Sequence, residues 1–257
     1  GAGAAEYDSA REALEAAAGL EATVQLGAGV YNEGGSLSVG PRLSLVGAGA
    51  DLTFLHCSRG SALRCAAGAV RVAGLTIHQT EPTPAQPAYA LEMRGGGQDS
   101  RPLRIEKCSL SASSAAKLSA ALLVHGARVE AHFCDFHAPV AAGVLLVAGA
   151  YLDISMGEVA NCGGCGICAL PGSILCANGL EIRACNESAI LASKGSSVTL
   201  NGALISGCGG GAHPAVSVKG GGQLTMTKCE LDAPCGAGVQ LADGASASLH
   251  ATTISRP

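Results

Sequence analysis

The amino-acid sequence predicts an all-β protein, a parallel β-helix in which about ten short coils stack into a solenoid. Three observations predict this fold. Segments of the chain align without gaps at a spacing of 23 residues, as 143–159, 166–182 and 189–205 show. Each repeat is too short to bury an apolar face alone, so repeats must stack on one another. Glycine occurs 37 times and tryptophan is absent, which suits thin layers built from small side chains.

Within each repeat, pairs of alternating apolar residues mark short strands. Val144 and Leu146 form one pair, Leu152 and Ile154 form the next, and Val159 marks a third strand. Glycine turns separate the pairs, because glycine adopts the left-handed backbone conformation without steric cost. A three-sided coil of this length is what a right-handed parallel β-helix needs, with equivalent strands about 4.8 Å apart.

The N-terminal segment 7–20 predicts an amphipathic α-helix that caps the first coil. Ser9 and Glu12 have the spacing of a capping box, and Gly19 stands where the helix should end. No equivalent cap follows Ile254. Because an open sheet end invites aggregation, we expect that the chain continues there or that a partner covers that end.

Composition limits the functions open to this chain, which we interpret as one domain over 1–257 with its coils over 21–257. The formal net charge of −4 and the lack of a basic run argue against a nucleic-acid partner. No apolar stretch reaches the length of about 18 residues that a transmembrane segment needs. We therefore expect a soluble protein of an intracellular or organellar compartment, without a cofactor.

Three cysteines in a short segment raise the question of a metal site. Cys162, Cys165 and Cys168 follow one another at intervals of three. The repeat, however, places Cys162 in one column with Cys185 and Cys208, and cysteine in a stacked column behaves as a small buried hydrophobe. Register also predicts that the three neighbouring thiols do not converge, so packing is favoured over a metal. Disulfides between stacked cysteines stay open as an alternative.

Register brings three carboxylates together on the outer surface. Asp135, Glu158 and Glu181 are expected in one outward column, with His137 and Arg183 in the column beside it. Carboxylates at a spacing of about 4.8 Å repel one another and can bind a cation or perform general acid–base chemistry. The alternative is a solvated acidic stripe, partly balanced by Arg183 and His137.

An outward apolar strip is the second candidate site, because contiguous exposed apolar surface usually marks a contact region. The strip is predicted to comprise Leu122, Leu145, Cys168 and Leu191. With His137 and Arg183, these residues form the predicted binding set for a partner protein. The alternative is that a neighbouring loop, 80–89 or 95–102, covers the strip.

The N-terminal third resembles the opening of pectin-lyase-like right-handed β-helix proteins. The elements that carry the resemblance are the helix Ser9–Ala17, the segment Gly29–Glu33 and the segment Leu43–Gly49. This superfamily includes pectate lyases, polygalacturonases and pectin esterases, and also the non-enzymatic β-helix of F-box proteins. Of the polygalacturonase motifs only His125–Gly126 is present, and the pectate-lyase and esterase motifs are missing.

The resemblance therefore leaves two functions open. The first is a non-catalytic scaffold or recognition module that binds another protein, including a peripheral subunit of a larger assembly. The alternative is a polysaccharide lyase or glycoside hydrolase acting on an acidic polysaccharide through Asp135, Glu158 and Glu181. The missing motifs and the scarcity of aromatic residues, with no Trp and four Tyr, argue against the enzyme.

Overall fold

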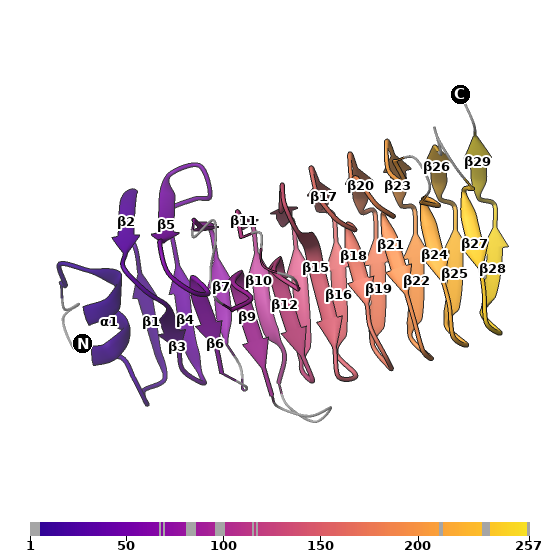
Figure 1. Cartoon of the computed structure of the whole chain (residues 1–257). Helices are drawn as coiled ribbons and strands as arrows, with labels where there is room; N and C mark the ends of the chain where they lie inside the picture. The colour runs from indigo at the N-terminus through magenta and orange to yellow at the C-terminus, as the bar shows by residue number, and fades with distance from the viewer. Residues whose placement is uncertain are drawn as a thin grey trace.

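The computed structural model of the chain describes residues 6–66, 68, 70–80, 86–95, 101–114, 116, 118–210, 213–232 and 237–255. Over this part of the chain it forms a parallel β-helix with three long sheets (Figure 1). Two sheets have ten strands and the third has nine, which gives nine complete coils and two strands of a tenth. The predicted solenoid of about ten coils is therefore confirmed.

The strands of each coil occupy the three sheets in turn, and every pairing between coils is parallel. Sheet A contains β1 (Ala22–Gln25), β4 (Leu43–Val46), β7 (Arg71–Ala73), β10 (Leu103–Glu106), β13 (Arg128–His132), β16 (Tyr151–Ser155), β19 (Ile174–Asn178), β22 (Ser197–Asn201), β25 (Gln223–Thr227) and β28 (Ser246–His250). Sheet B contains β2 (Gly29–Glu33), β5 (Thr53–Cys57), β8 (Thr76–Gln79), β11 (Ser109–Ala112), β14 (Asp135–His137), β17 (Glu158–Ala160), β20 (Glu181–Arg183), β23 (Leu204–Ser206), β26 (Glu230–Asp232) and β29 (Thr253–Ser255). Sheet C contains β3 (Leu37–Val39), β6 (Leu63–Cys65), β9 (Tyr89–Arg94), β12 (Ala120–His125), β15 (Ala142–Val147), β18 (Ile167–Ala169), β21 (Ile190–Ala192), β24 (Val216–Val218) and β27 (Val239–Leu241).

The core runs along the axis of the solenoid, between the inner faces of the three sheets. Inward positions stack in columns, so that Leu152 of β16 lies beside Leu175 of β19 and Val144 of β15 lies beside Ile167 of β18. All four side chains have no exposed surface. Burying each such side chain contributes about 1.5–3 kcal/mol, which is why one coil alone cannot fold but a stack can.

Two residues make the bend from sheet A to sheet B in most coils. The first of them directly follows the sheet A strand and has a positive φ, as in Gly74, Gly179 and Gly202. Two of the coils place a bulky apolar residue there instead, Phe133 with φ of 54° and Met156 with φ of 54°. Since this conformation costs an L-residue about 1–2 kcal/mol, both positions carry local backbone strain.

The N-terminal end of the solenoid is covered by α1 (Ala10–Ala16), as Figure 1 shows. The helix is shorter than the predicted segment 7–20, but its predicted cap is present. The Ser9 side chain accepts a hydrogen bond from the Glu12 backbone N–H at 3.1 Å, and the apolar face with Ala10 and Leu14 is buried. The chain turns away at Gly19, whose φ is +79°.

Candidate functional site

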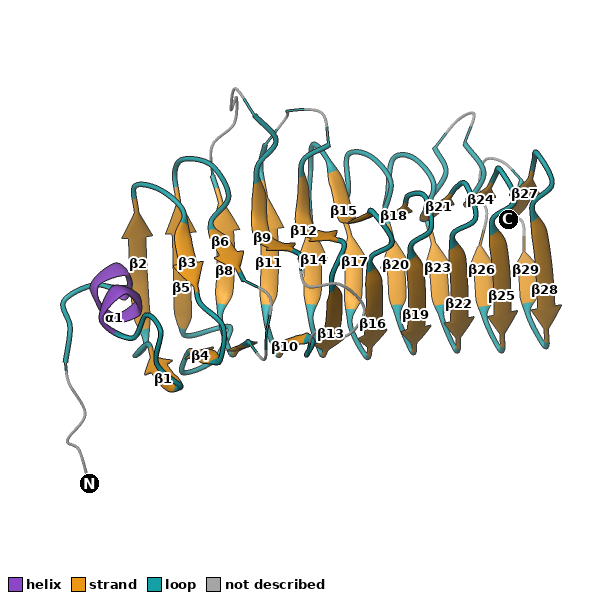
Figure 2. Ribbon diagram, turned by 90° about the horizontal axis from the view of Figure 1, so that it is seen from below, coloured by secondary structure: helices purple, strands orange, loops and turns teal. Residues whose placement is uncertain are grey.

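The acidic column predicted from the repeat is present on the outer face of sheet B. Asp135 of β14 pairs with Glu158 of β17, which pairs with Glu181 of β20. These strands lie side by side along one face in Figure 2. The residue that follows each carboxylate, such as Phe136 or Val159, is fully buried. Since side chains alternate between the two faces of a strand, the carboxylates point outward.

Two of these three carboxylates are paired with a cation. Arg183 places one guanidinium nitrogen 2.6 Å from Glu158 and another 3.5 Å from Glu181. Asp135 is not paired with that arginine and forms no ion pair among the described residues. His137 lies in the same column as Arg183 but two coils away, with the buried Ala160 between them. Among the described residues, no group of three or more His, Cys, Asp or Glu side chains is arranged to hold a metal ion.

Asp135 instead opens into a cavity of about 460 Å³ at the corner between sheets A and B. Its lining comes from the loop between β4 and β5, from the bends that follow β7, β10 and β13, and from the start of β14. The cavity is lined by Gly47, Ala48, Gly49, Ala50, Asp51, Gly74, Lys107, Cys108, Phe133 and Asp135. Its lining therefore includes two carboxylates, one ammonium group and one aromatic ring.

The loop of this cavity needs glycine for steric reasons. A Cβ at Gly47 would overlap the carbonyl oxygen of Gly74 in the next coil. A Cβ at Gly49, where φ is +155°, would lie 2.8 Å from an oxygen of the Asp51 carboxylate. The glycines thus let the loop pack against the neighbouring coil and keep Asp51 at the cavity.

Phe133 gives this corner an apolar surface. Its side chain is 58% exposed and Met156, one coil further along, is 59% exposed. Both residues adopt the left-handed backbone conformation, which costs energy and recurs at functional positions. Sequence analysis missed Lys107, Phe133 and Asp51 because they lie in bends outside the strand pattern.

The predicted apolar strip is wrong at Leu122. Strand β12 pairs with β15 so that Leu122 lies beside Val144 and Leu123 lies beside Leu145. Leu122 therefore points into the core, where it has no exposed surface, and Leu123 takes the outward position. The physical reason is that the bend after β15 contains one more residue than the bend after β12, so the offset is 22 residues in sheet C and 23 in sheet A.

The strip is also largely covered. Leu123 and Leu145 are only 2% and 4% exposed and pack with Tyr89 in a second apolar cluster outside the main core. Cys168 packs against this cluster and stays half-buried, and Leu191 is also half-buried. The loops 80–89 and 95–102, expected as alternatives for the cover, lie partly outside the described residues.

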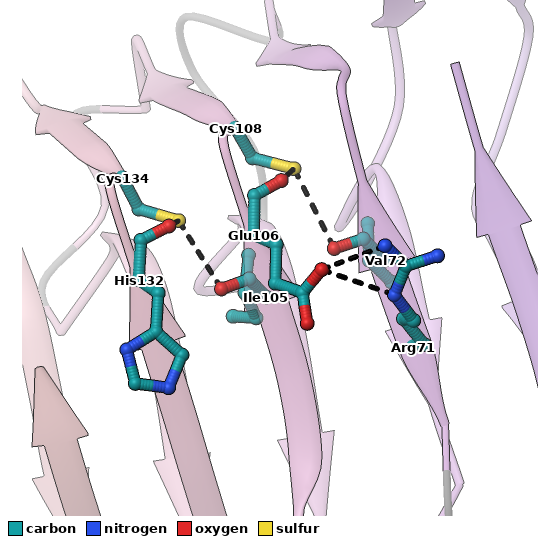
Figure 3. A network of polar contacts seen from close by, with 7 residues as sticks. All are labelled: Arg71, Val72, Ile105, Glu106, Cys108, His132 and Cys134. Carbon is teal, nitrogen blue, oxygen red and sulfur yellow. Dashed lines mark hydrogen bonds and ion pairs between the residues drawn. The ribbon is translucent and has the colours of Figure 1, made fainter.

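The stacked cysteines are core residues, as predicted. Cys162, Cys185 and Cys208 are at most 2% exposed, and none of these three forms a disulfide. The thiol contact with Cys162 raises the pKa of Cys185 to about 12, which makes this sulfur unreactive. Figure 3 shows the same arrangement in another column, where the thiols of Cys108 and Cys134 donate hydrogen bonds to backbone carbonyls of the preceding coil at 3.7 and 3.4 Å.

The three neighbouring cysteines, Cys162, Cys165 and Cys168, occupy different positions in the coil. Cys165 lies in the bend directly before β18 and donates a hydrogen bond to the Glu187 carboxylate at 3.1 Å. Cys168 lies on the outer face of β18 beside Leu145. Cys162 remains apart from them in the core.

A buried carboxylate on the outer face of sheet C also escaped sequence analysis. Glu92 of β9 accepts a hydrogen bond from the Ser61 hydroxyl at 2.6 Å and forms ion pairs with Arg64 and Arg94. Burial favours the protonated form, but the Ser61 and Arg94 hydrogen bonds prevail and lower the pKa of Glu92. The ion pair with Arg64 connects β9 with β6 of the preceding coil on the outer face of sheet C.

Comparison with solved structures shows which proteins share this architecture. Tailspike protein 2 from a bacteriophage of Escherichia coli O157:H7 superposes with a TM-score of 0.71 at 14% identity, over 91% of this chain and 35% of that chain. Pectin methylesterase from carrot superposes with a TM-score of 0.59 at 15% identity, over 97% of this chain and 80% of that chain. The catalytic domain of an α-1,3-glucanase superposes with a TM-score of 0.51 at 9% identity, over 91% of this chain and 61% of that chain. The chain thus spans about a third of the tailspike, and these likenesses show a common fold.

Sequence comparisons agree with the fold. No curated protein sequence matches the chain.

Among the described residues, no helix is long and apolar enough to cross a membrane. The family model for a right handed beta helix region matches residues 89–254, more than half of the chain. The structural neighbours, a pectin methylesterase among them, have the fold that the resemblance to pectin-lyase-like proteins implied. The chain therefore belongs to the family of right-handed β-helix proteins.

Proposed function

We propose that the chain is a carbohydrate-active protein that binds an acidic polysaccharide at the corner between sheets A and B and hydrolyses it. The observation that carries this proposal is a cavity whose lining includes two carboxylates, Asp51 and Asp135, and the exposed aromatic ring of Phe133. Tailspike, esterase and glucanase neighbours with the same fold support the choice of a carbohydrate over a protein partner.

Two carboxylates are what glycoside hydrolysis needs. One protonates the glycosidic oxygen while the C–O bond breaks, and the other activates the water that attacks the sugar carbon, or attacks it directly. Asp135 is exposed and free of an ion pair among the described residues, so its carboxylate is accessible to a substrate. Asp51 is the second carboxylate at the cavity.

The remaining lining fits an acidic sugar. Lys107 is exposed at the cavity and supplies a cation for a uronate carboxylate. The Phe133 ring is exposed and offers a face on which a sugar ring can stack. The pair Glu158 and Glu181, already neutralised by Arg183, lies further along the same face and contributes hydrogen-bond acceptors for the extended chain.

The protein-binding alternative has less support, because its predicted surface is mostly buried. Leu122 lies in the core, and Leu145 is 4% exposed. Of the apolar strip, a partner protein could reach only the half-buried Cys168 and Leu191. Contacts of that size leave little apolar area to remove from water.

The test is the release of reducing ends from a panel of acidic and neutral polysaccharides, such as polygalacturonate, alginate and a β-glucan. Asp135→Asn should lower kcat at least about 100-fold, since general acid–base groups contribute about 10²–10⁴-fold. Phe133→Ala should chiefly raise KM. The control is Glu230→Gln, which removes a carboxylate from the same outward column four coils away.

An unchanged rate for Asp135→Asn alongside an active wild-type chain would remove Asp135 from catalysis. If Glu158→Gln alone abolished activity, the site would lie further along the column. If no polysaccharide is cleaved and none retards the chain in affinity gel electrophoresis, the carbohydrate proposal is wrong.

A further inference from the structure

A second cavity lies on the outer face of sheet C, toward the N-terminal end of the solenoid. It has a volume of about 280 Å³ and is built on β3, β6 and β9, which lie side by side (Figure 1). Its lining residues are Ser38, Val39, Gly40, Arg64, Cys65, Ala66, Glu92 and Arg94. It shares no residue with the cavity between sheets A and B and is independent of the proposed carbohydrate function.

One buried carboxylate holds two arginines at this cavity. Glu92 is 6% exposed and accepts a hydrogen bond from the Ser61 hydroxyl at 2.6 Å. The Nε atom of Arg64 approaches the same carboxylate oxygen from the neighbouring strand, at 3.4 Å. Arg94 contacts the other oxygen through its own Nε atom. The two guanidinium groups are therefore anchored on either side of a single carboxylate.

The outer ends of both guanidinium groups stay available for a ligand. Since Arg64 and Arg94 contact Glu92 through Nε, the terminal nitrogens of each group keep their N–H donors. Both side chains are more than half exposed, and among the described residues neither forms an ion pair except with Glu92. Ser38 lies opposite Arg64 in the register and adds an exposed hydroxyl to the cavity. The cavity thus offers hydrogen-bond donors from three side chains.

The charges of this cluster do not balance. Arg64 and Arg94 each carry a positive charge, and Glu92 is the only acidic side chain that lines the cavity among the described residues. One positive charge is left over. A buried carboxylate costs free energy unless its partners offset the cost, and here those partners are the groups that it anchors. A bound anion would neutralise the remaining charge at the exposed side of the two arginines.

We propose that Arg64 and Arg94 bind a tetrahedral oxyanion, a phosphate or sulfate group, in this cavity, with Glu92 as the positioning residue. Guanidinium groups bind such anions through pairs of N–H bonds. Two groups anchored on neighbouring sides suit an anion whose oxygens point in several directions, whereas a planar carboxylate is matched by one group alone. The anion can be a free ion or a monoester of a larger molecule, because a monoester keeps its unsubstituted oxygens.

The experiment is isothermal titration calorimetry of the full chain with inorganic phosphate, inorganic sulfate, methyl phosphate and acetate in chloride buffer. Wild type should bind phosphate and sulfate at one site, and acetate at least about tenfold more weakly. Arg64→Lys and Arg94→Lys keep the charge but lose the planar group, so each should weaken phosphate binding at least about tenfold. The double variant Arg64→Gln with Arg94→Gln should not bind. The control Arg71→Gln removes an exposed arginine that pairs with Glu106 on sheet A, and should bind as wild type.

The positioning role of Glu92 has its own measurement. Glu92→Gln keeps both arginines but removes the charge that anchors them. The preference for phosphate over acetate should then fall to less than about threefold, because mobile guanidinium groups no longer discriminate by shape. An unchanged preference in a folded Glu92→Gln chain would exclude the positioning role. Circular dichroism of every variant separates loss of the site from loss of the fold.

Three results would overturn the anion site. The first is a wild-type chain that binds neither phosphate, sulfate nor methyl phosphate, or that binds acetate as tightly as these. The second is a double variant that binds phosphate like wild type. The third is an Arg71→Gln chain that loses as much affinity as Arg64→Lys. Methyl phosphate identifies the source of the anion: binding as tight as that of phosphate supports an ester group of a larger molecule, and weaker binding supports the free ion.

Discussion

Gly157 offers a direct test of coil stacking. It lies directly before Glu158, and a Cβ at this position would lie 3.2 Å from the carbonyl carbon of Cys134 and still closer to its oxygen. The obstacle is backbone of the neighbouring coil, so it cannot rotate away. Gly157→Ala therefore forces two coils apart by about 1 Å against a normal spacing of about 4.8 Å.

The cost can be worked from the contacts around this residue. The Glu158 N–H donates to the Cys134 carbonyl at 3.0 Å, and this bond would lengthen past its useful range. Losing one such bond costs about 0.5–1.5 kcal/mol. Overpacking a tight interior costs about 1–3 kcal/mol. We expect Gly157→Ala to lower the free energy of unfolding by about 2–4 kcal/mol.

The assay is urea denaturation followed by circular dichroism, with Gly35→Ala as the control. A Cβ at Gly35 meets nothing within 4 Å, so this variant should stay within about 0.5 kcal/mol of wild type. If Gly157→Ala were as stable as Gly35→Ala, the close approach between the coils of Cys134 and Gly157 would not exist. The register assigned to the acidic column would then be wrong as well.

Two further substitutions test the core and the Glu92 network. Phe136→Ala should lower the free energy of unfolding by about 3–5 kcal/mol in the same urea assay, because this fully buried side chain is among the largest in the core. A loss below about 1 kcal/mol would contradict the buried position of Phe136. Glu92→Gln should cost about 1 kcal/mol at pH 7, since its arginine partners are more than half exposed. Because folding lowers the pKa of Glu92 below its ordinary 4.5, this contribution is complete above that pH and disappears as the pH falls. Equal losses for Glu92→Gln at neutral and acidic pH would exclude the ionised form as the cause.

The repeat pattern was enough to predict the stacking of coils. Where repeats align without gaps, as from Asp135 through Glu158 to Glu181, the predicted neighbours are the neighbours in the structure. The pattern failed at Leu122, because one extra residue in a bend changes the offset in one sheet and leaves it unchanged in another. A shift of one residue moves a side chain from the outer face to the core.

The cavity could not be predicted in the same way. Asp51, Lys107 and Phe133 lie in bends and in a long loop, where no alternation of apolar residues fixes the direction of a side chain. One regularity could have indicated Lys107 and Phe133 as residues of this corner, since both directly follow a sheet A strand.

The positive-φ residue that starts the bend between sheets A and B has a consequence for how such a surface can evolve. Since glycine, lysine, phenylalanine and methionine all occupy this position in one chain, the backbone there accepts exchange at modest energetic cost. Each coil thus presents one exchangeable side chain in a row along the edge between the two sheets. New binding specificities can arise by substitution at these positions, while the core of the solenoid keeps its structure.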